Sequence, residues 1–202
     1  MILNLPNIIS WIRILIVPFF FYFLINGNDG SVEAACILYF FASASDFFDG
    51  WLARKYGEVS KFGKFIDPLA DKILTTAAFF AFSIMGIVEL WMVLIIVIRD
   101  FGTTFLRIHI DRTGKVFKTS LAAKWKTTIQ MFFIAFVLIL LLLKETNIFT
   151  EKVLGASVEN INSILFSDVI YVCMSLITAL SVWTGLEYFI IKNTEHEKNQ
   201  QS

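Results

Sequence analysis

The sequence MFFIAFVLILLLL at residues 131–143 contains no charged or hydrogen-bonding side chain. With the four residues before it, this run approaches the ~20 residues that a helix needs to cross the hydrocarbon core of a membrane. Five further stretches are of similar length and predominantly apolar. Together the six predicted spans cover residues 8–25, 32–50, 69–85, 88–106, 127–143 and 169–191. We therefore expect an all-α, polytopic integral membrane protein with six transmembrane helices and a short N-terminal interfacial segment.

The composition supports this fold class. Of the 202 residues, 57% are hydrophobic, 17% are charged and 22 are phenylalanine. A soluble chain of this length has too little interior to bury so much apolar surface. Seventeen basic residues balance seventeen acidic ones, which excludes a basic nucleic-acid-binding domain. Cys36 and Cys173 lie within apolar runs and are expected to be small hydrophobic residues without a disulfide. We expect a single domain over residues 1–202.

The distribution of basic residues predicts the orientation, because cytoplasmic loops of membrane proteins are enriched in lysine and arginine. With a cytoplasmic N-terminus and six alternating spans, only Lys144 and Lys152 lie on the outer side. The inner side holds Arg54, Lys55, Lys61, Lys64, Arg107, Arg112, Lys115, Lys118, Lys124, Lys126, Lys192 and Lys198. Both termini are therefore expected on the cytoplasmic side of the cell (inner) membrane.

Four aspartates occupy span ends where charge is costly. Residues 45–72 read SDFFDGWLARKYGEVSKFGKFIDPLADK. Asp46 and Asp49 share one helix face, and so do Asp67 and Asp71, because their spacings are three and four residues. Consecutive antiparallel helices are expected to be neighbours, so the two pairs can converge. Four carboxylates that meet in a low-dielectric site favour hard divalent cations such as Mg²⁺ or Mn²⁺. Arg54 suits phosphate oxygens, which favours phosphoryl chemistry at this site.

Three of the four aspartates also have a purely structural interpretation. Asp67 before Pro68 could cap a helix N-terminus. Asp71 with Lys72, or Asp49 with Arg54, could form an interfacial ion pair whose side chains extend to water. Such separate interpretations leave the shared facing of four carboxylates unexplained. Ionisable groups within membrane spans usually mark a functional site, and we favour that interpretation.

The whole segment resembles the signature of the CDP-alcohol phosphatidyltransferase family. Every specified position matches: Asp46, Asp49, Gly50, Ala53, Arg54, Gly63, Asp67 and Asp71. The resemblance implies a two-ion site in which Asp46, Asp49 and Asp67 hold one ion. Asp46, Asp67 and Asp71 would hold the other, with Asp71 also acting as general base.

The resemblance further implies the donor and the reaction. Gly50, Arg54 and the hydroxyl of Ser60 stand at the family positions that contact the CDP part of the donor. An acceptor hydroxyl would attack the phosphorus attached to the lipid, and CMP would leave. Membrane lipid and a second copy of the chain, in a homodimer, are the partners that the family implies.

Basic residues on the fourth and fifth spans indicate the acceptor. Arg99 and Arg107 are eight residues apart and share a helix face, while Lys124 and Lys126 begin the neighbouring span. A cluster of cations beside a carboxylate–metal site suits an acceptor that carries its own phosphate. We expect these four residues to bind that phosphate, although Arg99, which lies deeper in the fourth span, could instead pair with a carboxylate.

Three stretches resemble the bacterial subfamily whose acceptor is sn-glycerol 3-phosphate and whose product is phosphatidylglycerophosphate. They are residues 5–13, 65–72 and 124–131, and the resemblance extends over roughly residues 4–143. One departure is Asp100, where a longer glutamate would be expected after Arg99. The polar contacts around Arg99 are therefore expected to differ from the subfamily pattern.

Two kinds of alternative remain open. The chain could use another acceptor of the same family, such as serine, inositol phosphate or phosphatidylglycerol. Serine carries no phosphate and would not need the cationic cluster. The chain could also be a divalent-cation transporter, although transporters often have broken helices near the bilayer midplane and paired repeats, neither of which the sequence suggests.

Overall fold

The computed structural model describes residues 5–28, 30–56, 63–112, 121–146 and 158–200. Side chains are described within residues 10–28, 30–45, 69–70, 72–106, 125–146 and 159–187. All regular structure in the described residues is helical, which confirms the all-α prediction. The helices are α1 (Leu5–Asn26), α2 (Ser31–Tyr56), α3 (Gly63–Ile84), α4 (Leu90–Arg112), α5 (Leu121–Glu145), α7 (Val158–Leu165) and α8 (Asp168–Gln200).

Each predicted span lies within or nearly coincides with a helix, but several helices are longer than the apolar runs. α2 continues past residue 50 to Tyr56, and α4 continues past residue 106 to Arg112. α1 runs without a break from Leu5, so the described part of the predicted interfacial segment continues the first span. Charged residues end an apolar run without ending the backbone hydrogen bonding, which accounts for the longer helices.

The turn between α3 and α4 shows how the chain reverses with few residues. Gly86 adopts a φ of 74°, a left-handed conformation that favours glycine. Its amide donates to the carbonyl of Ser83 at 3.1 Å, and the amide of Ile87 donates to Phe82 at 2.9 Å. This pair of bonds is a Schellman motif, which satisfies the last carbonyls of α3 and turns the chain into α4.

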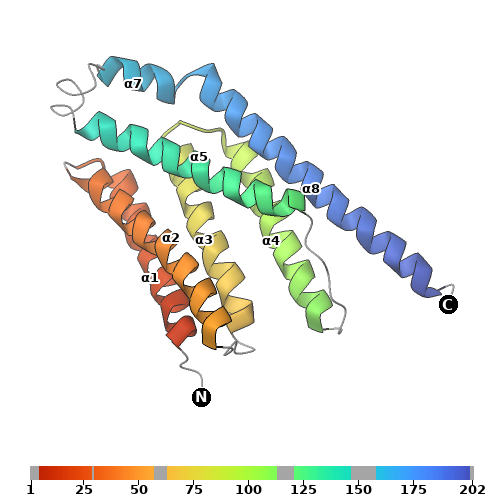
Figure 1. The fold of residues 1–202 in the computed structure, drawn as a ribbon. Helices are drawn as coiled ribbons and strands as arrows, with labels where there is room; N and C mark the ends of the chain where they lie inside the picture. Colours follow the sequence, from red (N-terminus) through yellow and green to blue (C-terminus); the bar gives the residue numbers. More distant parts are fainter. Residues whose placement is uncertain (1–4, 29, 57–62, 113–120, 147–157, 201–202) are drawn as a thin grey trace.

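α3 and α5 contact each other, and each also contacts three other helices. α1 packs against both α2 and α3, α4 packs against α3 and α8, and α5 contacts α2, α7 and α8 (Figure 1). The core between them includes the buried rings of Phe20, Phe79 and Phe82. α2 and α3 touch only marginally, because α1 is the main neighbour of both. The expectation that α2 and α3 pack directly is therefore met only in small part.

Large apolar side chains also cover the outside of the bundle. Ile98, Phe132 and Trp183 are each more than 70% exposed. By length and hydropathy, the described residues contain two helices able to cross a membrane, Trp125–Glu145 and Glu159–Glu187. Shorter apolar helices cover Ser10–Asn26, Ser31–Ser45 and Lys72–Ile84. Lipid is the solvent that suits such a surface, since water would strongly disfavour it.

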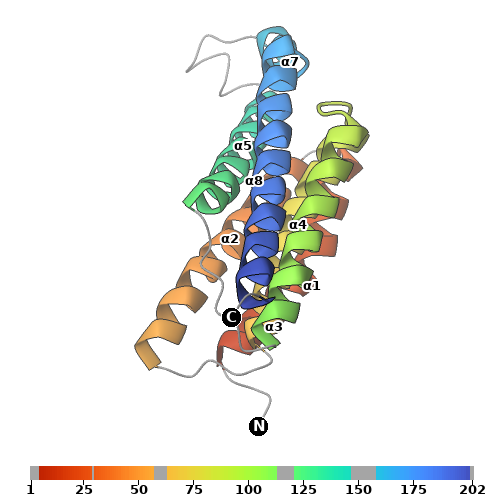
Figure 2. The same cartoon turned by 90° about the vertical axis from the view of Figure 1, so that its right-hand side faces the viewer.

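The polar ends of several helices lie at the same end of the bundle. Figure 1 shows the C-terminal ends of α2 and α4 at the same end of the bundle as the N-terminal ends of α1 and α3. Figure 2, turned by 90°, shows that the C-terminal end of α2 lies to one side of α3, and that α8 runs between α5 and α4. This end of the bundle carries the motif-bearing segments predicted from the sequence.

Candidate functional site

The signature motif lies at the C-terminal end of α2 and the N-terminal end of α3. Asp46 and Asp49 are in α2, and Asp67 and Asp71 are in α3, so each pair occupies one face of an observed helix. The side chains of these four residues lie outside the described part of the structure. Because Figure 2 shows the end of α2 apart from α3, the meeting of the two pairs stays a prediction.

The residues expected to contact the CDP part of the donor are placed only by their backbone. Gly50 and Arg54 belong to α2, a few residues beyond Asp46 and Asp49. Their side-chain environment is outside the description, and Ser60 lies outside the described residues altogether. Their assignment therefore rests on the sequence motif.

A buried ionic cluster forms beside the α3 half of the motif. Asp100 of α4 is 4% exposed and accepts a hydrogen bond from Lys126 of α5. Arg99 donates to the same carboxylate through Nη1 at 3.0 Å, and the Nζ of Lys72 in α3 lies 3.6 Å from its other oxygen. We call Lys72, Arg99, Asp100 and Lys126 the Asp100 cluster. It joins three helices through one carboxylate.

The position of Lys72 connects this cluster to the motif. Lys72 directly follows Asp71, the last aspartate of the signature. Its contact with Asp100 therefore brings α4 and α5 to the point where the motif ends in α3. From the sequence, Lys72 was expected to pair only with Asp71, and no spacing pattern indicated a contact with a residue 28 positions later.

The four predicted phosphate-binding residues are placed unequally. Arg99 and Lys126 come together on Asp100, with side chains 14% and 0% exposed. Arg107 is in α4 and Lys124 is in α5, but their side chains lie outside the description. The structure thus joins two of the four, and Asp100, the departure noted in the sequence, is the residue that joins them.

Arg99 has a further partner that the sequence did not reveal. Its Nη2 donates to the hydroxyl of Thr184 in α8 at 2.6 Å. Its Nε is buried and has no acceptor among the described residues. Gln130, one turn after Lys126, likewise has a buried side-chain nitrogen without a described acceptor. Buried donors without partners are costly, so these two nitrogens are suited to donate hydrogen bonds to oxygen atoms of a ligand.

A buried arginine fixes α2 just before the motif. Arg13 of α1 is 1% exposed, and its Nε donates to the backbone carbonyl of Ala42 at 3.1 Å. Ala42 is four residues, about one helical turn, before Asp46. This bond links α1 to α2 about one helical turn before Asp46, where the motif begins.

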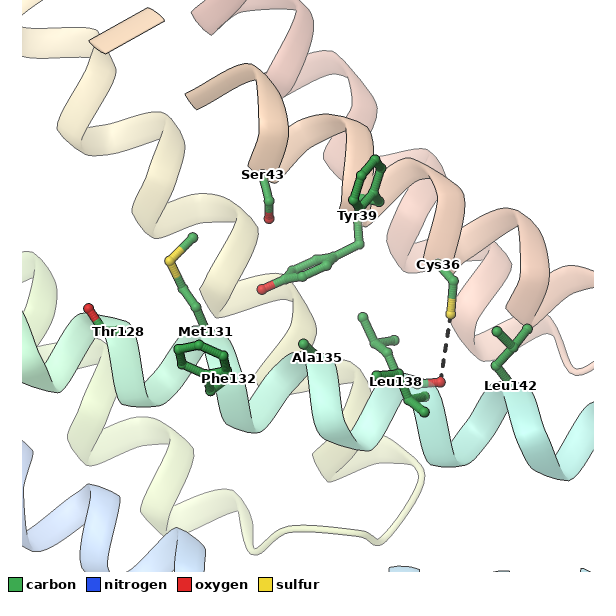
Figure 3. Close-up of a pocket in the computed structure, with 11 residues that line it drawn as sticks. Cys36, Tyr39, Ser43, Thr128, Met131, Phe132, Ala135, Leu138 and Leu142 are labelled. Carbon is green, nitrogen blue, oxygen red and sulfur yellow. Dashed lines mark hydrogen bonds between the residues drawn. The ribbon is translucent and has the colours of Figure 1, made fainter. Parts of the chain in front are cut away.

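An apolar cavity of about 440 Å³ opens between α2 and α5. Figure 3 shows Cys36, Tyr39 and Ser43 of α2 facing residues from Thr128 to Leu142 of α5, with the Cys36 thiol 3.7 Å from the carbonyl of Leu138. Ser43 and Thr128 mark the end of the cavity nearest the motif and Lys126. Its lining along α5 covers about 21 Å of helix, more than half of a ~30 Å hydrocarbon core. Cys36 and Cys173 are free cysteines, of which Cys36 is half-buried and Cys173 is exposed.

Comparison with known proteins agrees with the family resemblance of the signature motif. The sequence model of a family described as CDP-alcohol phosphatidyltransferase matches residues 3–183. A CDP-diacylglycerol–glycerol-3-phosphate 3-phosphatidyltransferase from Bacillus subtilis is 38% identical over 140 residues, which cover 63% of this chain and 72% of that protein. A similarly named protein from Rickettsia bellii is 32% identical over 188 residues, covering 92% of this chain and 93% of its own. A probable phosphatidylglycerophosphate synthase from Mycobacterium tuberculosis is 39% identical over 132 residues, and the chain spans 63% of its length.

Proposed function

The chain belongs to the CDP-alcohol phosphatidyltransferase family, and we propose that it transfers the phosphatidyl group of CDP-diacylglycerol to sn-glycerol 3-phosphate. The products are phosphatidylglycerophosphate and CMP. Relatives that are 32–39% identical carry names for this reaction. Family membership supplies the reaction class, and the acceptor must be argued from this chain's own residues.

The observation that carries the choice of acceptor is the Asp100 cluster. Three cationic side chains, from α3, α4 and α5, gather around the Asp100 carboxylate. One of them belongs to Lys72, which directly follows Asp71. Burying cations is costly, so their concentration beside a reaction site needs a reason. A phosphate on the acceptor supplies one, whereas an uncharged acceptor hydroxyl does not.

Arg99 is the group best placed to contact that phosphate. A guanidinium has five N–H donors, of which one is directed at Asp100 and one at Thr184. Its Nε–H has no described acceptor, and its side chain keeps some exposure. Lys126 is fully enclosed and contributes positive charge from behind the carboxylate. Arg107 and Lys124 complete the proposed phosphate site from the same helices.

The family is divalent-metal dependent, and the motif's donor set fits a hard ion. Only carboxylate oxygens are offered, two from one face of α2 and two from one face of α3. Oxygen ligands of this kind suit Mg²⁺ or Mn²⁺. We propose that Asp46, Asp49, Asp67 and Asp71 hold two such ions, which when bound neutralise negative charge on the pyrophosphate and on departing CMP.

The remaining roles belong to protein side chains. Asp71 accepts the proton of the attacking acceptor hydroxyl, whose oxygen forms the new bond to the lipid-linked phosphorus. The bond from that phosphorus to the CMP oxygen breaks, and CMP departs with the electron pair. Gly50, Arg54 and Ser60 hold the CDP portion of the donor, with Arg54 suited to its phosphate oxygens.

We assign the cavity between α2 and α5 to one acyl chain of the donor. Its near end, at Ser43, is three residues before Asp46, and its lining is predominantly apolar. A diacylglycerol whose phosphate reacts at the motif would have its tail extending in this direction, into the membrane. The apolar lining can bury methylene groups, each worth about 0.8 kcal/mol.

The proposed function also includes an arrangement of the chain in the membrane. Six helices cross the inner membrane with both termini in the cytoplasm, and the site faces the cytoplasm, where CMP and glycerol 3-phosphate are soluble. Two copies form a homodimer, as the family resemblance implies. A site at the boundary lets the nucleotide stay in water while the lipid tails stay in the bilayer.

An acceptor assay tests the proposal. Purified chain in mixed micelles is given CDP-diacylglycerol, Mg²⁺ and glycerol 3-phosphate, and CMP release is measured together with the lipid product. Parallel reactions contain serine, inositol phosphate or phosphatidylglycerol. Among the four acceptors, we expect only glycerol 3-phosphate to give CMP release. A chelator should abolish this release, and added Mg²⁺ or Mn²⁺ should restore it.

Each other outcome has a defined meaning. CMP release with serine but not with glycerol 3-phosphate would move the chain to another acceptor within the family. No CMP release with any acceptor, together with divalent-cation flux into vesicles, would favour the transporter alternative.

A further inference from the structure

The last helix contacts the proposed phosphate-binding arginine through two consecutive residues. α8 runs between α4 and α5 in Figure 2, and α4 and α8 pack closely. Thr184 accepts a hydrogen bond from Arg99, and Gly185 lies against the aliphatic part of the same side chain. The family match ends at residue 183, so both residues lie just beyond it.

The hydroxyl of Thr184 is oriented to accept from Arg99. Its Oγ1 lies 2.9 Å from the carbonyl of Leu180 and can give its single hydrogen to α8's own backbone. Its lone pairs are then available for the Nη2–H of Arg99 at 2.6 Å. Thr184 is 3% exposed, so water does not compete freely for this bond. The threonine therefore holds one side of the guanidinium, while Asp100 holds the other.

Gly185 provides the space in which Arg99 lies. A methyl group added at this position would come within 3.1 Å of Arg99 Cγ and 3.5 Å of its Nε. Cγ is near the backbone and cannot move aside as the end of a flexible side chain can. A methyl group at 185 would therefore require the Arg99 side chain to shift by a few tenths of an ångström at Cγ.

We propose that Thr184 and Gly185 are positioning residues that fix Arg99 in the orientation needed to bind the acceptor's phosphate. This inference rests on the proposed function, in which Arg99 contacts that phosphate. A guanidinium held between Asp100 and Thr184 loses little further freedom when a ligand arrives. α8 then contributes to acceptor affinity without touching the acceptor.

The test compares three variants by steady-state kinetics. Thr184→Val removes the hydroxyl at nearly constant volume, Thr184→Ser keeps it, and Gly185→Ala presses on Arg99. We expect Thr184→Val and Gly185→Ala each to raise the KM for glycerol 3-phosphate about fivefold, the scale of one typical hydrogen bond. The KM for CDP-diacylglycerol should stay within twofold of wild type, and Thr184→Ser should restore the acceptor KM.

Two matched controls lie on the same helix. Ser181→Ala removes a buried hydroxyl that has no described partner, and Leu186→Ala changes an exposed apolar side chain. Neither contacts Arg99 in the described contacts, so both should keep the acceptor KM of wild type. A general loosening of α8 would instead raise the acceptor and donor KM together in all of these variants.

A double-mutant cycle separates positioning from simple stabilisation of the helix. In an Arg99→Ala background, adding Thr184→Val should cause no further increase in acceptor KM, because the arginine through which it acts is gone. An equal fivefold increase in both backgrounds would overturn the inference. So would an unchanged acceptor KM in both Thr184→Val and Gly185→Ala.

The outcomes also distinguish this inference from the proposed function. Wild-type chain that releases no CMP with glycerol 3-phosphate would refute the function itself. Wild-type chain that is active, with variants that behave like the controls, would refute only the role of α8. If Thr184→Val does not fold, Gly185→Ala and its double mutant with Arg99→Ala decide the matter.

Discussion

Two faces of α5 lie in contrasting environments, one in the ionic Asp100 cluster and the other at the apolar cavity shared with α2. One face carries the buried side chain of Lys126, which is paired with Asp100 in the Asp100 cluster, and, one turn later, the buried polar side chain of Gln130. Another face, from Thr128 to Leu142, lines the cavity shared with α2, where contacts are apolar and space remains. The difference supports the two roles proposed for this helix: the cluster fixes charge in a defined geometry, and the cavity has the apolar lining and the space that an acyl chain needs.

The largest effect should come from the chemical step next to the cluster. Asp71→Asn keeps an oxygen ligand but cannot take the proton of the acceptor hydroxyl, so kcat should fall by about a hundredfold or more. Much of the metal affinity should remain, since three aspartates are unchanged. CMP release measured across a Mg²⁺ titration separates the two effects.

The matched control is Asp168→Asn, at the start of α8 and the opposite end of the bundle from the start of α3 (Figure 1). It should keep wild-type turnover. A normal kcat at saturating Mg²⁺ in Asp71→Asn would remove the general base from this position.

The next effect tests whether the Asp100 cluster is held by its one carboxylate. Asp100→Asn leaves Lys72, Arg99 and Lys126 close together without a negative partner. Removing one member of a buried ionic group costs about 3 kcal/mol, so the free energy of unfolding should fall by about that amount. Titration with a denaturing detergent, followed by circular dichroism, measures it.

Asp100→Glu is the conservative comparison, because it keeps the charge and restores the residue expected in the related subfamily. It should retain most of the stability and activity of wild type. Equal stability of Asp100→Asn and wild type would show that the three cations do not depend on this carboxylate.

The sequence predicted the helices better than it predicted what joins them. Apolar runs located six of the described helices, because each contains a long, predominantly apolar stretch. Two stretches of the described residues, Trp125–Glu145 and Glu159–Glu187, are long and apolar enough to cross a membrane, and the six-span arrangement stays a prediction. α7 was missed since Val158–Leu165 is short and mixes polar with apolar residues. The extensions of α2 and α4 were missed because hydropathy does not report where a charged helix ends.

The site shows the same contrast between local and long-range information. Arg99 and Lys126 were expected to act together, and the structure brings them onto one carboxylate. Lys72 and Thr184 were not expected there, because their contacts join positions 28 and 85 residues apart along the chain. Such contacts depend on how helices cross, and a single sequence carries no periodic signal for helix crossing.

A smaller effect should appear at the acceptor alone. Arg107→Ala removes one proposed cation from the phosphate site and should raise the KM for glycerol 3-phosphate about tenfold. The donor KM should not change. Arg112→Ala, at the last position of the same helix, is the matched control and should leave both values near wild type. A defect confined to the donor would contradict the role given to Arg107.

The smallest effect should come from the apolar region, and it should depend on the length of the donor's tail. Ala135 lines the cavity between α2 and α5, and Ala135→Phe would fill part of its 440 Å³. We expect about a fivefold higher KM for a long-chain CDP-diacylglycerol, because buried methylene groups lose their site, and little change for a dioctanoyl donor. The KM for glycerol 3-phosphate should be unaffected, since the cluster lies on another face of α5. Ala179→Phe, on the exposed surface of α8, controls for added bulk. If the two chain lengths respond equally, the cavity does not hold the tail, and the contrast between the two faces of α5 concerns packing alone.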